Sequence, residues 1–399
     1  MNVLLLSTEM PPLFRGGLGS YTLQIASRLG RRKNKVKLIV LLEGTDYSIL
    51  QSDDTIFNQS TAAPNIELHF IDNMKEMMEE IMTEELISVG RLEEQFSSDI
   101  LESIQDYDLV HCNDWFTALY GAYIKFRYDI PMVFSVHLPV YAGFTYSTHI
   151  PPLDTKRRLE YLGLRCADAI IVASNYTKEI ILSTYNIDEK KIRIIPIGID
   201  TAFFSGSGGK PANERDVLFI SRLAEQKGID YLLDFLEISN RLRGNVRFSE
   251  LNFRIVGTGP AAKDIIKKIH KNNLDNVKLL GFIPSLQDLK DLYLNSYLFL
   301  MTSIFEPFGI VALEAMACGL PVLGFDVGGL SEFIRNNKDG ILVPPGDVSA
   351  LYNAFNKLII NPGLVNQMSV NARNRAQNFD LSIHLKQLLE VYSEVTTDR

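Results

Sequence analysis

Short apolar runs rich in β-branched residues alternate with helix-like segments along the whole chain, and this alternation constrains the fold more than any other feature. Apolar runs of this length are typical of strands buried on both faces, as in parallel sheets covered by helices. One series consists of Val3–Thr8, Val36–Leu42, Ile66–Ile71, Leu109–Asn113, Met132–His137, Ala169–Ser174 and Ile192–Ile197. A second series consists of Val217–Ser221, Phe253–Gly257, Val277–Gly281, Leu298–Thr302, Pro321–Phe325 and Ile341–Pro344. The sequence therefore predicts an α/β protein with two doubly wound, Rossmann-like domains.

A segment rich in glycine, serine, lysine and proline, Ser205–Asn213, separates the two series. The 399 residues also exceed what one hydrophobic core usually supports. We expect the first domain over residues 1–203 and the second over residues 204–378. Residues 379–399 contain an amphipathic pattern that predicts a final helix.

Ligands of doubly wound sheets bind at the carboxyl ends of the strands, so motifs at those ends carry most of the functional information. The most informative motif follows the run Leu298–Thr302 and places Glu306 in a loop and Glu314 in a helix-like segment. A separation of eight residues turns two side chains about 80° apart and moves them roughly 12 Å along an ideal helix. The two carboxylates therefore suit two parts of one long ligand.

Phe308, Gly309 and Ile310 lie between these carboxylates, where the helix is expected to begin. Glycine lets the backbone approach a ligand, and a helix start offers unpaired N–H groups with a partial positive charge, which is typical of a phosphate site. The site would therefore bind a phosphate, and the carboxylates on either side of it could accept hydrogen bonds from hydroxyls of the same ligand. A nucleotide sugar has these groups. The alternative is an ordinary strand, turn and helix with Glu306 on the surface.

Two cations follow the first strand of the second series. Arg222 and Lys227 can converge on a diphosphate, or they can be a surface pair without a role. The next strand ends in Gly257–Ala262, a near match to the dinucleotide fingerprint. No acidic residue ends the following strand and Pro260 lies inside the turn, so we interpret this segment, Gly257 included, as a ligand-facing loop.

The first strand of the chain ends in a turn that contains Gly16 and Gly17. These glycines can bring main-chain N–H groups against a diphosphate or a sugar, with Arg15 adding positive charge. A plain strand-to-helix turn is the alternative.

Polar residues also follow two later strands of the first series, Asp114 with Trp115 and then His137. His137 could donate a hydrogen bond to a sugar hydroxyl, Asp114 could accept one, and Trp115 could pack on a sugar ring. Each has a structural alternative: a satisfied histidine, a helix N-cap and a core residue. Because they follow adjacent strands, we favour a shared site.

Composition excludes several classes of function. The formal net charge of −8 argues against a nucleic-acid binder. Cys112, Cys166 and Cys318 are too scattered for a disulfide framework or a zinc site, so we expect no metal and a reducing, cytoplasmic location. The opening residues lack the basic start, the long apolar core and the small-residue cleavage site of a signal peptide, so we expect none, and we expect no membrane span because no apolar run is long enough. The basic run at residues 28–37 could touch an anionic membrane but is better interpreted as a solvated helix end, so membrane contact is expected to be peripheral at most.

The acidic, Met-rich residues 73–105 have a helical pattern. We interpret them as a helical excursion from the first sheet whose methionines pack in the core.

At these motifs the chain resembles the retaining nucleotide-sugar glycosyltransferases of the GT-B fold, and among them the glycogen and starch synthases. The resemblance extends over nearly the whole length and rests on residues 11–19, 111–115, 135–144, 221–228 and, most specifically, 306–322. It implies two domains that face each other across a cleft, with the last helix returning to the first domain.

The resemblance also implies roles for the candidate residues of the second domain. Arg222 and Lys227 would bind the donor diphosphate and offset charge on the departing nucleotide. Glu306 and the main chain of residues 308–310 would hold the transferred sugar, and Glu314 would bind the ribose.

In the first domain, the resemblance implies that His137 meets the donor sugar near its reacting face and that Asp114 meets the sugar or the acceptor. Gly16 and Gly17 would contact the phosphates. Bacterial and plant glucan synthases carry Lys-Thr-Gly-Gly in this first loop, where the present chain has Phe-Arg-Gly-Gly with Arg15. They also tend to lack a glutamate at the position of Glu314, so the donor nucleotide and the acceptor are open.

The resulting prediction is a retaining transferase that moves glucose from ADP-glucose or UDP-glucose onto an α-1,4-glucan, with the nucleotide sugar as substrate and no cofactor. The first alternative is a transferase of the same fold that moves mannose or N-acetylglucosamine to a lipid, a sugar phosphate or a small alcohol. A sugar-nucleotide epimerase, an NAD dehydrogenase and a noncatalytic sugar-binding protein are weaker alternatives. The oligomeric state is open.

Overall fold

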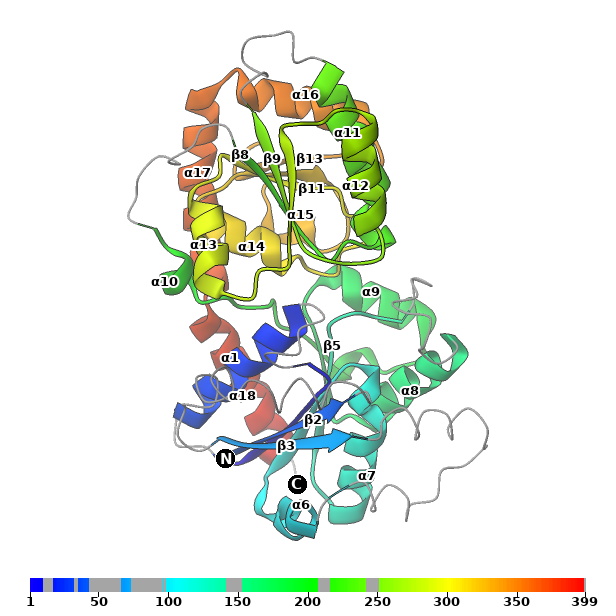
Figure 1. Ribbon diagram of the computed structural model, residues 1–399. Coiled ribbons are helices and arrows are strands. Elements are labelled where there is room, and N and C mark those ends of the chain that lie inside the picture. Colours follow the sequence, from blue (N-terminus) through cyan, green and yellow to red (C-terminus); the bar gives the residue numbers. More distant parts are fainter. Residues whose placement is uncertain are drawn as a thin grey trace. The chain divides into compact units, whose positions relative to one another are not determined.

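The structure is a computed structural model that describes residues 1–9, 17–31, 35–42, 66–72, 96, 98–140, 153–206, 216–241 and 251–397. The chain forms two compact units, Met1–Ile195 with Leu385–Arg399, and Pro196–His384. Each unit is built around one parallel sheet with helices on both faces (Figure 1).

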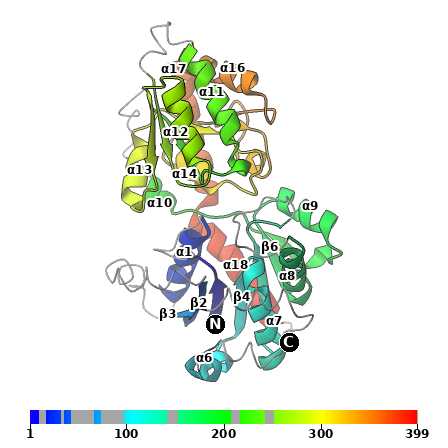
Figure 2. The ribbon, with the colours of Figure 1, turned by 45° about the vertical axis from the view of Figure 1, so that its right-hand side comes forward.

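The sheet of the first unit has seven strands in the order β3-β2-β1-β4-β5-β6-β7, all parallel. The strands are β1 Val3–Ser7, β2 Val36–Leu42, β3 Ile66–Asp72, β4 Leu109–Asn113, β5 Met132–Val136, β6 Ala169–Val172 and β7 Ile192–Ile194. Among the described residues, the helices are α1 Gly17–Arg31, α6 Ser98–Ser103, α7 Ala118–Tyr128, α8 Leu153–Cys166, α9 Asn175–Thr184 and the last helix, α18 Leu381–Thr397. Helices α1 and α18 lie on one face and α7 and α8 on the other (Figures 1 and 2). Every residue of β1, β4, β5 and β6 is buried, which is why their sequences are continuously apolar.

The sheet of the second unit has six strands in the order β10-β9-β8-β11-β12-β13, again all parallel. The strands are β8 Asp216–Ile220, β9 Asn252–Val256, β10 Val277–Gly281, β11 Leu298–Met301, β12 Val322–Phe325 and β13 Gly340–Val343. The helices are α10 Thr201–Phe204, α11 Ile229–Arg241, α12 Ala262–Lys271, α13 Leu286–Leu294, α14 Ile310–Ala317, α15 Leu330–Phe333, α16 Val348–Ile359 and α17 Pro362–Ala376. Helices α11 and α12 lie on one face of this sheet, and α13, α14 and α17 lie on the other (Figures 1 and 2).

The predicted fold class is confirmed, and each predicted run forms a strand within a few residues of its expected ends. Strand β8 begins at Asp216, one residue before the predicted run Val217–Ser221. Strand β8 includes the buried Asp216, because its carboxylate forms an ion pair with Arg254 of β9 and accepts a hydrogen bond from Asn252 Nδ2 at 2.9 Å. A charged residue can extend a buried strand when it is paired in this way.

The two chain crossings between the units lie at residues 195/196 and 384/385. Residues 196–203, expected in the first domain, belong to the second unit because they pair with the segment before the last helix. Ile199 N–H donates to the Phe379 carbonyl at 3.0 Å, and Thr201 Oγ1 donates to Asp380 Oδ2 at 2.6 Å.

The last helix, α18, forms as the amphipathic pattern predicts. Its later part belongs to the first unit, where the Tyr392 hydroxyl lies 2.5 Å from His111 Nδ1 and Glu394 forms an ion pair with Arg193.

Some sequence predictions fall outside the described residues. Arg15, Gly16, residues 32–34 of the basic run and residues 73–95 of the Met-rich segment are among them. Over the described part of the chain, every helix is too short or too polar to cross a lipid bilayer.

Candidate functional site

The predicted cation and the predicted loop carboxylate meet at the carboxyl edge of the second sheet. Lys227 ends the short 3-10 helix η4, Glu225–Lys227, after strand β8, and Glu306 lies in the loop after the neighbouring strand β11. Lys227 Nζ lies 2.6 Å from Glu306 Oε2, and the two side chains are 19% and 9% exposed. Ser303 Oγ also donates to this carboxylate oxygen at 3.3 Å. Arg222 lies half-buried in the loop between β8 and η4.

The two loops are held together by main-chain contacts. The Gln226 carbonyl accepts hydrogen bonds from the N–H groups of Ile304 and Phe305, and Thr302 Oγ1 donates to the Lys227 carbonyl at 3.0 Å. Gly228 has a φ of +63°, and a Cβ atom at this position would lie 1.8 Å from the Thr302 carbonyl oxygen. Only glycine permits this approach, which fixes the lysine against the loop that carries Glu306.

Helix α14 begins as the sequence predicts, immediately after Gly309. Gly309 has a φ of +107°, and an added Cβ would lie 2.6 Å from the Leu330 side chain. The Phe308 side chain is buried against Phe333 and Phe379, so any contact with a ligand would have to be made by its main chain. The first N–H groups of such a helix have no partners within it and carry a partial positive charge.

Glu314 lies in the second turn of α14 and is 7% exposed. Its Oε2 accepts a hydrogen bond from the Tyr293 hydroxyl of α13 at 2.9 Å. Burial raises the pKa of the Glu314 carboxyl to about 7, and the bond from Tyr293 partly opposes this rise. Sequence reasoning did not identify Tyr293 as a site residue. A tyrosine on an otherwise apolar helix face was the available signal.

The loop after β9, which contains Gly257 and Gly259, packs against the main chain of the loop that carries Arg222. Cβ atoms at Gly257 and Gly259 would lie 1.8 Å from the Ser221 carbonyl oxygen and 2.3 Å from the Leu223 carbonyl oxygen. Leu223 N–H also donates to the Thr258 carbonyl at 2.8 Å. These glycines therefore allow two main-chain segments to touch, which explains the near match to a dinucleotide fingerprint. A ligand contact at Gly257 stays a prediction.

In the first unit, Asp114 and His137 are brought together as predicted, and the Asp114 side chain does not cap the helix that follows it. The Asp114 carboxylate accepts the N–H groups of His137 at 2.7 Å and Leu138 at 3.3 Å, and makes no side-chain cap to the 3-10 helix η2, Trp115–Thr117. Asp114 also has a φ of 60° and a ψ of 172°, a backbone conformation that costs non-glycine residues roughly 1–3 kcal/mol and is concentrated at functional sites.

Burial raises the pKa of the Asp114 carboxyl to about 7. The two main-chain hydrogen bonds lower it, and the neighbouring Glu160 and Glu9 raise it further.

The His137 ring is oriented by Asn113. His137 Nε2 lies 2.9 Å from Asn113 Oδ1, and Asn113 Nδ2 donates to the Leu6 carbonyl at 3.0 Å, so the histidine proton is assigned to Nε2. The donor role expected for His137 toward a sugar hydroxyl stays a prediction. The Tyr21 ring packs edge-on at 4.8 Å between centroids.

The sugar-packing role expected for Trp115 is wrong. Its side chain is 8% exposed and lies in the hydrophobic core of the first unit, where Lys156 Nζ lies 5.8 Å from its ring centre. Gly17 is the first residue of α1, and Gly19 N–H donates to Glu9 Oε2 at 3.3 Å. Sequence reasoning missed Glu9, whose signal is its place two residues after the end of β1.

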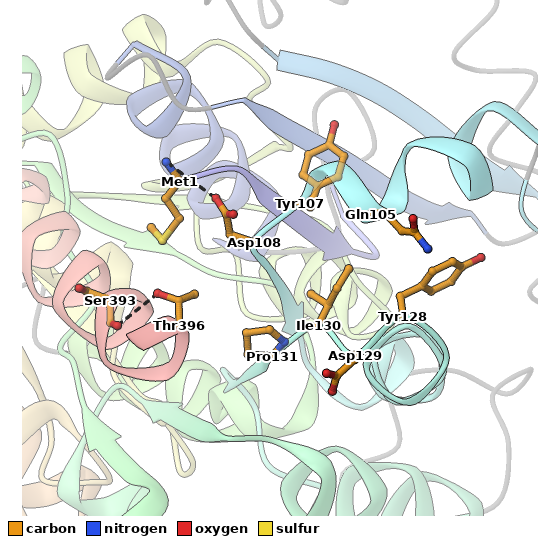
Figure 3. Close-up of a pocket in the computed structure, with 10 residues that line it drawn as sticks. All are labelled: Met1, Gln105, Tyr107, Asp108, Tyr128, Asp129, Ile130, Pro131, Ser393 and Thr396. Atoms are coloured by element: carbon orange, nitrogen blue, oxygen red, sulfur yellow. Dashed lines mark hydrogen bonds and ion pairs between the residues drawn. The ribbon is translucent and has the colours of Figure 1, made fainter. Parts of the chain in front are cut away.

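A cavity of about 700 Å³ lies elsewhere in the first unit. It is at the amino ends of β1, β4 and β5, next to Met1, Asp108 and Pro131, and Ser393 and Thr396 of α18 line its other side (Figure 3). Ligands of such sheets bind at the opposite, carboxyl ends of the strands. The cavity is therefore separate from the candidate site.

Two family models match the chain. The model described as glycosyl transferases group 1 matches residues 200–375, and the model described as glycosyltransferase family 4 matches residues 15–203. Each match falls largely within one of the two units.

Three curated relatives illustrate the range of similar proteins. An uncharacterized glycosyltransferase of Methanocaldococcus jannaschii is 29% identical, over 94% of this chain and 93% of its own length. A D-inositol 3-phosphate glycosyltransferase of Kineococcus radiotolerans is 24% identical, over 100% and 96%. A glycogen synthase of Mycobacterium tuberculosis is 26% identical, over 98% and 94%.

Solved structures share the fold over the whole chain. The sucrose-phosphate synthase of Thermosynechococcus elongatus has a TM-score of 0.78 at 23% identity and covers 100% of both chains. HepE of Anabaena, in complex with UDP-glucose, has a TM-score of 0.75 at 22% identity and covers 99% of this chain and 100% of its own. Taken with the family models and the relatives, this shared GT-B architecture leads to one conclusion: the chain belongs to the group 1 glycosyltransferases.

Proposed function

We propose that the chain is a retaining glycosyltransferase that moves glucose from UDP-glucose or ADP-glucose onto an α-1,4-glucan. The observation that carries this proposal is the meeting of Lys227, Glu306 and the start of α14 at one edge of the second sheet. A cation, a carboxylate and helix-start N–H groups are the groups that recognise a diphosphate joined to a sugar. The UDP-glucose bound to HepE of Anabaena, which has the same fold, supports a glucose donor.

In the proposed reaction, the bond between the anomeric carbon and the diphosphate oxygen breaks. A new bond forms from that carbon to an acceptor hydroxyl oxygen on the same face, and the hydroxyl proton passes to the departing diphosphate. Arg222, Lys227 and the start of α14 offset the negative charge that grows on the leaving group, while Glu306 orients the sugar. The chain's own cations supply this charge, so we propose that no metal is required.

Two acceptors are supported by the relatives. The glycogen synthase of M. tuberculosis supports a glucan, whereas the D-inositol 3-phosphate glycosyltransferase of K. radiotolerans supports a sugar phosphate or a small alcohol. Residues 113–115 and 137–144 resemble those of glucan synthases and favour the glucan, whereas the glutamate at position 314 and the arginine at position 15 depart from the glucan synthase pattern and keep the second acceptor class as the alternative.

The proposal is tested by incubating the purified chain with UDP-, ADP- and GDP-sugars, with glycogen or inositol 3-phosphate as acceptor. We expect glycogen-dependent release of UDP or ADP and a product whose anomeric configuration, read by proton NMR, is that of the donor. Glu306→Gln should abolish transfer in a variant that still folds, although losing the ion pair with Lys227 should lower its unfolding temperature. Glu225→Gln, which changes an exposed glutamate in the neighbouring loop, should keep transfer. Release of the nucleotide only with inositol 3-phosphate would show that the acceptor is a sugar phosphate and not a glucan. No release of nucleotide from any donor would contradict the proposal.

A further inference from the structure

Glu160 lies on helix α8 and is 1% exposed. Its carboxylate accepts the N–H group of Val140 with both oxygens, at 3.0 and 3.2 Å. The hydroxyl of Tyr185, the residue directly after α9, donates to Glu160 Oε2 at 2.6 Å. One buried carboxylate therefore joins helix α8, the end of α9 and the loop that follows β5.

This contact completes the hydrogen bonding of the loop at residues 137–140. The first two N–H groups of the loop donate to Asp114, the third residue is Pro139, which has no N–H, and the fourth N–H donates to Glu160. Two carboxylates on different elements thus accept every main-chain N–H group of residues 137–140, the described part of the loop that carries His137. A buried N–H group left without an acceptor costs about 1–3 kcal/mol, so each contact restrains the loop.

Helix α8 is placed for this role by Gly163, which lies three residues after Glu160 on the same helix face. A Cβ atom at Gly163 would lie 2.5 Å from the ring of Phe134, a fully buried residue of β5. The helix therefore packs closely against the strand that delivers His137, and Glu160 reaches the residues just past the strand's end.

The carboxyl of Glu160 is costly to bury. Burial raises its pKa to about 7, while the hydrogen bonds from Tyr185 and Val140 and the charge of Arg157 lower it. An apolar side chain of similar volume would fill the space without this cost but would leave the Val140 N–H unpaired. The carboxylate is thus suited to holding the loop rather than to filling the core.

We propose that Glu160 is a positioning residue for His137 and acts through the main chain of residues 137–140. The inference rests on the proposed function, in which His137 meets the donor sugar. The nucleotide is held by residues of the second unit in that function, so loosening the loop changes the reaction rate and leaves nucleotide binding intact.

The test compares Glu160→Met, which removes the acceptor, with Glu160→Gln, which keeps one acceptor oxygen. Glu160→Met should lower kcat by about tenfold or more and change the donor KM and the UDP dissociation constant by less than about threefold. Glu160→Gln should restore part of kcat, and Tyr185→Phe should lower it in the same direction but less. Asp154→Asn, an exposed carboxylate on the same helix, removes the same charge and should match the wild type.

Hydrogen exchange of a peptide covering residues 132–140 provides a readout that needs no activity. Exchange should be faster in Glu160→Met, even if no sugar donor supports turnover, so failure of the proposed function is distinguishable from failure of this inference. Wild-type kcat in Glu160→Met, or a lowered unfolding temperature with kcat unchanged, would overturn the positioning role. If Glu160→Met does not fold, Glu160→Gln and Tyr185→Phe decide, and wild-type kcat and exchange in both would overturn it.

Discussion

Lys227 and Glu306 form an ion pair, with 2.6 Å between Nζ and Oε2. In the proposed function, Lys227 binds the donor diphosphate and Glu306 binds the transferred sugar. Removing the lysine and removing the carboxylate should therefore have different effects on nucleotide binding. Lys227→Met loses the cation that faces the diphosphate, whereas Glu306→Gln keeps that cation and releases it from its carboxylate.

The expected magnitudes follow from the charges. A hydrogen bond to a charged group contributes about 1.5–3 kcal/mol, so Lys227→Met should weaken UDP binding by about 10- to 150-fold. Glu306→Gln should leave UDP affinity unchanged or raise it. Lys227→Met should also lower the free energy of unfolding, by about 3 kcal/mol. This value is at the low end for breaking a buried ion pair, because in the wild type the Lys227 side chain is 19% exposed and the Glu306 side chain is 9% exposed.

Isothermal titration calorimetry with UDP and urea unfolding would measure both effects in Lys227→Met, Glu306→Gln and the double variant. Lys278→Met removes an exposed lysine of β10 in the same unit and is the matched control. The reasoning is refuted if Lys227→Met binds UDP as the wild type does. It is also refuted if Glu306→Gln weakens UDP as much as Lys227→Met.

Two further predictions concern stability. Gly228→Ala should lower the free energy of unfolding by about 2 kcal/mol or more, because φ is +63° and the added Cβ meets the Thr302 carbonyl oxygen, whereas Gly363→Ala in α17, with nothing within 4 Å, should be neutral or stabilising in the same urea assay. Burial raises the pKa of Glu314 to about 7 from its ordinary 4.5, so its contribution to stability is complete below pH 4.5 and is lost as pH rises from 4.5 through 7. The loss is about 3 kcal/mol, and Glu314→Gln should flatten this part of the stability profile; an unchanged slope would contradict the assignment.

The fold could be predicted because its determinants are local. Strands such as β4 and β5 are buried at every position, so their apolar runs mark them without any tertiary information. The lysine, the loop glutamate and the helix start at Gly309 were also predictable, because parallel strands bring their carboxyl ends to one edge.

The remaining parts of the candidate site depend on partners far along the chain. Glu160 reaches Val140 across 20 residues, and Tyr293 reaches Glu314 across 21, and neither spacing forms a motif. The proton on His137 Nε2 depends on Asn113, whose own orientation is set by Leu6. The placement of Trp115 was wrong because position after a strand does not reveal whether a side chain turns toward the core or toward solvent.

In the proposed function, the second unit binds an activated sugar by its diphosphate and by two carboxylates. A crystal structure of the protein with UDP-glucose would locate each of these groups. We expect the diphosphate within hydrogen-bonding distance of Arg222, Lys227 and the N–H groups at the start of α14, the glucose on Glu306 and the ribose on Glu314. A nucleotide bound away from these residues, for example in the cavity beside Asp108, would contradict it.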